Sequence, residues 1–203
     1  LLSQVQTVIH TAANVKHYGS YESFYAANVE TVDRIIDFAS AAGARLIHAS
    51  TTSITGKTPA SHKGATPMIF SEQNLYVGQA LDNVYVRSKF EAEKRLLAAR
   101  LRGLPVHIMR IGNLTNRRTD GVFQSNQESN AFLARIKAIL GTGLVPLPLV
   151  TLPIEFTPVD EAAVAIMTLA EHFDPRYTVF HICNPYLISM EQLLAIFSRC
   201  GYP

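Results

Sequence analysis

The chain has 203 residues, of which 48% are hydrophobic and 17% are charged, so it is long enough to bury a core of its own. A net charge of +2 without any basic stripe argues against a nucleic-acid-binding surface. The longest apolar region, 136–154, is broken by Lys137, glycines and prolines, so we expect no membrane span. Two cysteines and the lack of a secretory signal indicate a cytoplasmic protein.

Strand-like and helical patterns alternate in the first half of the chain. In order, they predict a strand at 5–10, a helix at 23–42, a strand at 45–49, a loop at 52–80, a helix at 81–101 and a strand at 106–111. This alternation is typical of a parallel sheet with crossover helices. Since apolar residues on these strands do not alternate strictly with polar ones, we expect both faces of the sheet to be covered. The predicted fold class is α/β, a doubly wound parallel sheet.

The second half has a looser pattern and reads as a small C-terminal lobe. It predicts a loop at 112–128, a helix at 131–140, an extended segment at 141–158, a helix capped by Asp160, a strand at 178–182 and a last helix capped by Ser189.

One part of a dinucleotide site is missing from the sequence. A Rossmann-type site needs a glycine-rich turn between the first strand and its helix, where amides hold the pyrophosphate. Gly141-Thr142-Gly143 is the nearest candidate, but Leu-Val-Pro-Leu-Pro follows it instead of a helix. We therefore expect a Rossmann-type fragment whose first βαβ part is missing.

The most informative motif is Tyr85-Val86-Arg87-Ser88-Lys89, within the predicted helix 81–101. Residues four apart lie on one helix face, and an ammonium beside a phenol lowers the tyrosine pKa. The pair would then suit proton transfer. By itself it also fits an exposed helix with a packed tyrosine and a solvated lysine.

Small or polar residues follow each strand that should end at the ligand-binding crevice. They are His10-Thr11-Ala12-Ala13, the cluster from Ser50 to Gly56 that contains Thr51, and Ile111-Gly112-Asn113-Leu114. Asn28 is expected to bridge backbone or pack a helix. The strand histidines have no metal-ligand spacing and are expected in the core, so no metal site is predicted; they are His10, His48, His107 and His181.

These motifs resemble the extended short-chain dehydrogenase/reductase family, through Thr51 to Gly56, Tyr85 to Lys89 and Arg110 to Leu114. Within it, the chain is similar to thioester reductase domains of nonribosomal peptide and polyketide synthetases and of carboxylic acid reductases. The resemblance covers nearly the whole chain, and the segment from Gly112 to Asn126 is its most specific part.

The resemblance implies that Tyr85 donates a proton, Thr51 bonds the substrate carbonyl, and Lys89 holds the nicotinamide ribose of NADPH. Other cofactor-binding residues would be Thr11, Ala12, Ala13, Ile111, Gly112, Asn113 and Leu114. Residues 1–115 would form the C-terminal part of the NAD(P)-binding domain, and 116–203 mainly the substrate lobe, with elements returning to the sheet.

The implied reaction is reductive release of a phosphopantetheine-linked acyl or peptidyl thioester from a carrier protein, giving an aldehyde or, after a second round, an alcohol. Two alternatives stay open. One is another extended reductase or a sugar-nucleotide epimerase or dehydratase. The other is a non-catalytic cofactor-sensing domain, against which the intact Tyr85 and Lys89 count.

Overall fold

The computed structural model describes residues 4–16, 18–56, 69–125, 130–147, 150 and 153–202. The chain divides into two compact units. The first comprises Leu1–Ile111 and Ile166–Ile182, and the second comprises Gly112–Ala165 and Cys183–Pro203.

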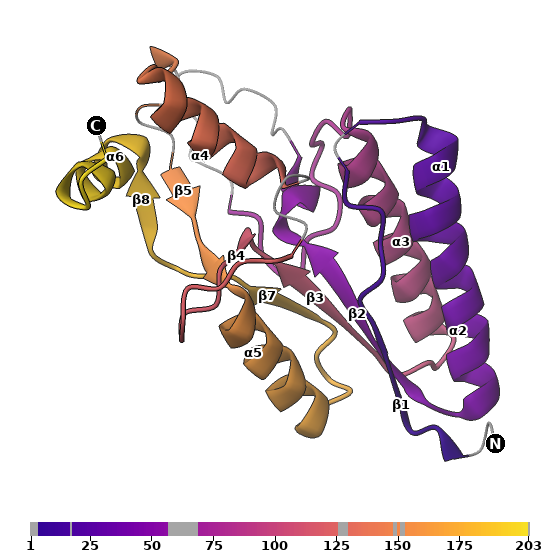
Figure 1. Ribbon diagram of the computed structural model, residues 1–203. Helices are drawn as coiled ribbons and strands as arrows, with labels where there is room; N and C mark the ends of the chain where they lie inside the picture. Colours follow the sequence, from indigo (N-terminus) through magenta and orange to yellow (C-terminus); the bar gives the residue numbers. More distant parts are fainter. Residues whose placement is uncertain are drawn as a thin grey trace. The chain divides into compact units, whose positions relative to one another are not determined.

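The first unit is built on a four-stranded sheet in the order β1-β2-β3-β7 (Figure 1). Its strands are β1 (Thr7–His10), β2 (Arg45–Thr51), β3 (Val106–Ile111) and β7 (Val179–Ile182), and every neighbouring pair is parallel. Parallel strands end at a common edge, and the register sets Thr51 beside Ile111 there. The predicted parallel α/β, Rossmann-like fold is confirmed.

One continuous helical run connects β1 to β2. It consists of α1 (Tyr21–Tyr25), the π-helical segment η2 (Ala26–Glu30) and α2 (Thr31–Ala42). Ser20 caps its start, and Gly43 ends it with a φ of 65°, a left-handed conformation that glycine adopts without a Cβ clash. The predicted helix is therefore confirmed, but the sequence pattern did not reveal its π turn.

Helix α3 (Val84–Leu101) connects β2 to β3 and, together with α2, covers one face of the sheet (Figure 1). Asn83 caps α3, since its side-chain oxygen accepts the N–H groups of Tyr85 and Val86. The buried cluster under these helices contains Val32, Ile36, Ala39, Leu46, Ala92, Leu96, Ala99, Leu104, Val106 and Ile108. The 3-10 helix η3 (Thr52–Thr55) directly follows β2, inside the predicted loop 52–80. Residues 57–68 of that loop lie outside the described residues.

The second unit contains two small two-stranded sheets and two helices. Strands β4 (Leu114–Thr115) and β6 (Thr157–Pro158) pair in parallel, and β5 (Pro153–Glu155) and β8 (Leu187–Ser189) pair antiparallel. The helices are α4 (Ala131–Thr142) and α6 (Met190–Arg199), the latter capped by Ser189 as predicted. Their shared core holds Ile136, Ile139, Ile154, Met190 and Leu193.

Helix α5 (Val159–Glu171) runs from residues of the second unit into residues of the first. Asp160 was predicted to cap this helix, and that prediction is wrong, because Asp160 lies within its first turn. The carboxylate instead accepts the backbone N–H groups of Arg118 and Thr119, and these bonds lower the pKa of Asp160. A partner some forty residues away leaves no local signal in the sequence.

No helix among the described residues has the length and apolarity that a membrane span requires.

Candidate active site

Thr51 and Tyr85 meet at the carboxyl edge of the sheet in the first unit. Thr51 is the last residue of β2 and is buried, and Tyr85 is the second residue of α3 and half-buried. Burial raises the pKa of Tyr85, and its hydrogen bond with the Thr51 side chain opposes that rise. Tyr85 is therefore a neutral phenol at neutral pH, which can donate a proton.

Lys89 lies one turn further along α3 and is only 2% exposed. Its Nζ donates to the Ala49 carbonyl oxygen over 2.6 Å and lies 3.0 Å from His48 Nε2. Burial lowers the pKa of Lys89 to about 8, although Glu93 acts in the opposite direction. The expectation that Lys89 lowers the Tyr85 pKa was wrong. The Lys89 ammonium forms its hydrogen bonds with residues of β2, and burial has the largest effect on the pKa of the Tyr85 phenol.

His48 carries this contact on to a second histidine. His48 Nδ1 lies 3.0 Å from His10 Nδ1, and both rings are buried. Burial, followed by the Lys89 charge, lowers the pKa of His48 well below its ordinary value, and the same causes lower the pKa of His10. The sequence placed both histidines in the core, which is confirmed. It missed the contact of His48 with Lys89 and the contact of His10 with His48.

A second polar group, formed by Ser50, Glu93 and Arg110, is buried beside the first. The Ser50 hydroxyl donates to Glu93 Oε1 over 2.5 Å, and Arg110 donates to both Glu93 oxygens. Arg110 also donates to the carbonyl oxygens of Ser71 and Asn74, in the segment leading to α3. These bonds hold in place Ser50, which precedes Thr51 in β2, and the segment that leads to Tyr85.

Asn28 lies in the π turn and bridges two segments. Its side-chain oxygen accepts the Asn14 N–H over 2.7 Å, and its side-chain nitrogen donates to the Asn14 carbonyl oxygen and to Ser88 Oγ, each over 2.9 Å. Ser88 in turn donates to the Tyr85 carbonyl oxygen. The predicted bridging role is confirmed. Single π turns are frequent at functional sites, and this one ties the chain after β1 to α3.

The predicted cofactor residues of the first unit are placed as follows. Thr11 and Ala12 are exposed directly after β1, and Ala13 is half-buried. Ile111 ends β3 and is buried, and its carbonyl oxygen accepts the Thr52 hydroxyl over 3.5 Å. Their contacts with a cofactor stay predictions.

In the second unit, the next three predicted residues are engaged with β5 and β6. A Cβ on Gly112 would lie 2.7 Å from Glu155 Cδ and from Thr157 Oγ1, so only glycine fits there. The Asn113 N–H donates to Glu155 Oε2 over 2.5 Å, and Leu114 pairs with Thr157. Glu155 also accepts the Thr157 hydroxyl and the Asn184 N–H, so one carboxylate fastens three segments. Glu155 was not among the predicted site residues, because its partners are distant in the chain.

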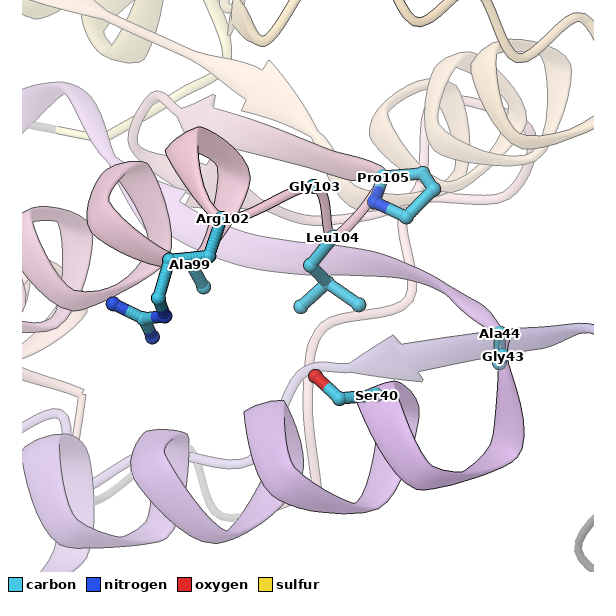
Figure 2. Close-up of a pocket in the computed structure, with 8 residues that line it drawn as sticks. All are labelled: Ser40, Gly43, Ala44, Ala99, Arg102, Gly103, Leu104 and Pro105. Atoms are coloured by element: carbon cyan, nitrogen blue, oxygen red, sulfur yellow. The ribbon is translucent and has the colours of Figure 1, made fainter.

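One hollow of the first unit does not coincide with these residues. It has a volume of about 380 Å³ and is lined by the ends of α2 and α3 and by the turns that precede β2 and β3. Figure 2 shows the Ser40 and Leu104 side chains on opposite sides of this hollow. It therefore lies at the amino ends of the strands, whereas ligands of parallel α/β sheets bind at the carboxyl ends. Among the described residues no cluster is suited to hold a metal ion.

Comparison with known proteins agrees with this geometry. The chain is 30% identical to Glycine betaine reductase ATRR of Emericella nidulans, over all of this chain and 15% of that protein. It is 27% identical to a linear gramicidin synthase of Brevibacillus parabrevis, over all of this chain and 4% of that protein. The thiolation-reductase di-domain of an archaeal non-ribosomal peptide synthetase matches with 34% identity and a TM-score of 0.88, over 97% of this chain and 42% of that one.

The predicted resemblance to synthetase reductase domains is thus confirmed, and the chain spans less than half the length of each of these relatives. Two nucleotide-sugar epimerases share the architecture at 17% and 19% identity, which shows the fold alone. The profile described as Male sterility protein, an NAD-binding family, matches residues 1–166. The chain therefore belongs to the Male sterility protein family.

Proposed function

We propose that this chain is the catalytic part of an NADPH-dependent reductase that releases a carrier-bound acyl or peptidyl thioester as an aldehyde. The observation that carries the proposal is the hydrogen bond between Thr51 and a neutral Tyr85, one helical turn from the buried Lys89. The 34% identity to a thiolation-reductase di-domain supports the choice of a carrier-bound thioester. The cytoplasmic location stays a prediction.

The residues present fit a nicotinamide cofactor. An ammonium has three N–H donors, and within the described part of the chain Lys89 uses two of them, on Ala49 and His48. The third can bond a ribose hydroxyl. The exposed Thr11 and Ala12 leave the backbone after β1 open to a flat ring. We propose these residues, with Ala13, Ile111, Gly112, Asn113 and Leu114, as the cofactor-binding set. When bound, NADPH supplies the hydride.

The protein contributes charge stabilisation and a proton. Reduction of a thioester carbonyl places negative charge on its oxygen, and donors arranged for that charge stabilise the transition state. We assign this role to the Thr51 hydroxyl and the Tyr85 phenol. Tyr85 then transfers its proton to the oxygen, which gives a hemithioacetal. Loss of the carrier thiol from this intermediate leaves the aldehyde.

We retain residues 1–115 as the cofactor-binding part and 116–203 as mainly the substrate lobe. The partner is a carrier protein whose phosphopantetheine arm bears the substrate. Preference for NADPH over NADH follows from the family resemblance.

The test is to mix the complete protein with NADPH and an acyl-phosphopantetheine carrier protein. We expect NADPH oxidation together with an aldehyde that a hydrazine reagent traps. Turnover of a nucleotide sugar without thioester reduction would favour the epimerase alternative. NADPH binding with no turnover of any carrier-bound acyl chain would favour the cofactor-sensing alternative.

A further inference from the structure

His10, His48 and Lys89 form a line of hydrogen bonds across three elements of the first unit. Lys89 Nζ lies 3.0 Å from His48 Nε2, and His48 Nδ1 lies 3.0 Å from His10 Nδ1. The exposed fractions are 2%, 1% and 7% for Lys89, His48 and His10, so water competes little for these bonds.

The direction of each bond follows from the chemistry of the groups. An ammonium only donates, so His48 Nε2 must accept from Lys89. A neutral imidazole that accepts at Nε2 carries its proton on Nδ1, so His48 donates to His10 Nδ1. His10 must then hold its own proton on Nε2. Both imidazoles are neutral at pH 7, because burial and the Lys89 charge lower the pKa of each.

We propose that His48 is a positioning residue for Lys89, and that His10 holds His48 in the one tautomer able to do this. The Ala49 carbonyl oxygen and His48 Nε2 fix two of the three ammonium N–H groups. Since the three point in staggered directions, the third is thereby fixed as well. The ammonium is thus presented to a ligand in one orientation. Only the identity of that ligand, the ribose of NADPH, rests on the proposed function.

The alternative is that the two histidines merely fill the core. His107 supplies a matched control, because it lies in β3, is fully buried, and donates through Nε2 to the Asp174 carbonyl oxygen, away from Lys89. It also stacks on Phe173, so its replacement should disturb packing at least as much. A purely structural role predicts the same outcome for both histidines.

The first measurement needs no substrate. In nitrogen-15 spectra of the complete protein at pH 7, we expect a proton on His48 Nδ1 and none on Nε2. The Lys89 pKa, followed through its side-chain resonances, should fall by about one unit in His48→Leu, which removes a hydrogen-bond acceptor from a charged group. Glu93, which raises the Lys89 pKa, and His10 and Tyr85 are unchanged in that variant. His48→Gln, whose amide oxygen can accept in place of Nε2, should restore most of the shift.

The second measurement is NADPH affinity without thioester. We expect about tenfold weaker binding in His48→Leu, near wild-type binding in His48→Gln and unchanged binding in His107→Leu. A proton on His48 Nε2 at pH 7, or an unchanged Lys89 pKa in folded His48→Leu, would overturn the proposal. So would equal losses of affinity in His48→Leu and His107→Leu. If these results hold while the protein fails to reduce any thioester, the positioning role stands and the proposed function does not.

Discussion

The guanidinium of Arg110 and the carboxylate of Glu93 form an ion pair, with Nη2 and Oε2 2.8 Å apart and exposed side-chain fractions of 1% and 0%. Two charges so far from water stabilise the fold only while both are present, because either one alone would be buried without compensation. The pair therefore behaves as a unit that links α3 to β3.

Glu93→Gln should lower the free energy of unfolding by about 3–5 kcal/mol, since it leaves the Arg110 charge unpaired. Glu91→Gln on the same helix is the control. Its ion pair with Lys94 is partly exposed, so the expected change is below about 1 kcal/mol. Urea denaturation of both variants gives the comparison. Equal losses of unfolding free energy in the two variants would show that the buried Glu93–Arg110 pair matters no more for stability than the partly exposed Glu91–Lys94 pair.

Tyr85→Phe removes the proposed proton donor but keeps the ring. We expect turnover to fall by about 10²-fold or more, with NADPH affinity retained. Tyr76→Phe, at a tyrosine that is 65% exposed, should have the activity of the wild type. Steady-state kinetics with a carrier-bound thioester measures both variants. Wild-type turnover in Tyr85→Phe would remove Tyr85 from the mechanism.

Lys89 should make stability depend on pH. Its pKa is about 8 in the fold against 10.5 in its unperturbed state, so between these values the unfolded chain binds more protons than the folded one. The free energy of unfolding of the wild type should therefore rise with pH, by about 3 kcal/mol relative to Lys89→Met between pH 8 and 10.5. Below pH 8 Lys89 is charged in the folded chain as well, so the burial of this charge then lowers the free energy of unfolding by its full amount.

Lys94→Met is the control for this pH dependence, because half of its side chain is exposed. Its difference from the wild type should stay constant over the same range. If the difference in free energy of unfolding between the wild type and Lys89→Met were also independent of pH, burial would not shift the pKa of Lys89.

Gly112→Ala should destabilise the second unit by about 1–3 kcal/mol, because its Cβ would overlap the Glu155 carboxylate. Gly141→Ala is the matched control. That glycine lies in α4, and apart from its chain neighbours and the backbone of its own helix no heavy atom lies within 4 Å of the added Cβ, so alanine should stabilise by up to about 1 kcal/mol. Thermal unfolding of the two variants distinguishes these outcomes, and a stabilised Gly112→Ala would contradict the packing described around Glu155.

The sequence predicted what depends on local pattern. Apolar runs placed the strands of the sheet, and β3 begins and ends where they indicated, at Val106 and Ile111. Capping chemistry placed the start of α6 at Ser189, whose side chain and that of Gln192 form a capping box. Both features are set by residues within a few positions of each other.

Contacts over long separations escaped the same reasoning. His48 and Ser50 are alternate polar residues of β2, and Lys89 and Glu93 are four apart on α3. Alternation puts the first pair on one face of β2, and helical periodicity puts the second pair on one face of α3. Two matching polar pairs were therefore readable as a signal. Which residue of β2 bonds to Lys89 depends on how α3 packs on β2. The pKa of Tyr85 depends on the same packing, because the packing buries the phenol.

The π turn at Ala26–Glu30 has a consequence for how this chain tolerates changes in length. A π turn holds one residue more than an α turn, so deleting Ala27 would let the run from Tyr21 to Ala42 become a regular α-helix. Because the π turn takes up its extra residue within about one turn, the parts of the helix on either side would keep nearly the same orientation after the deletion. Asn28 would lose the position in that turn from which it bonds Asn14 and Ser88. The extra residue therefore serves the placement of Asn28 and not the phase of the helix.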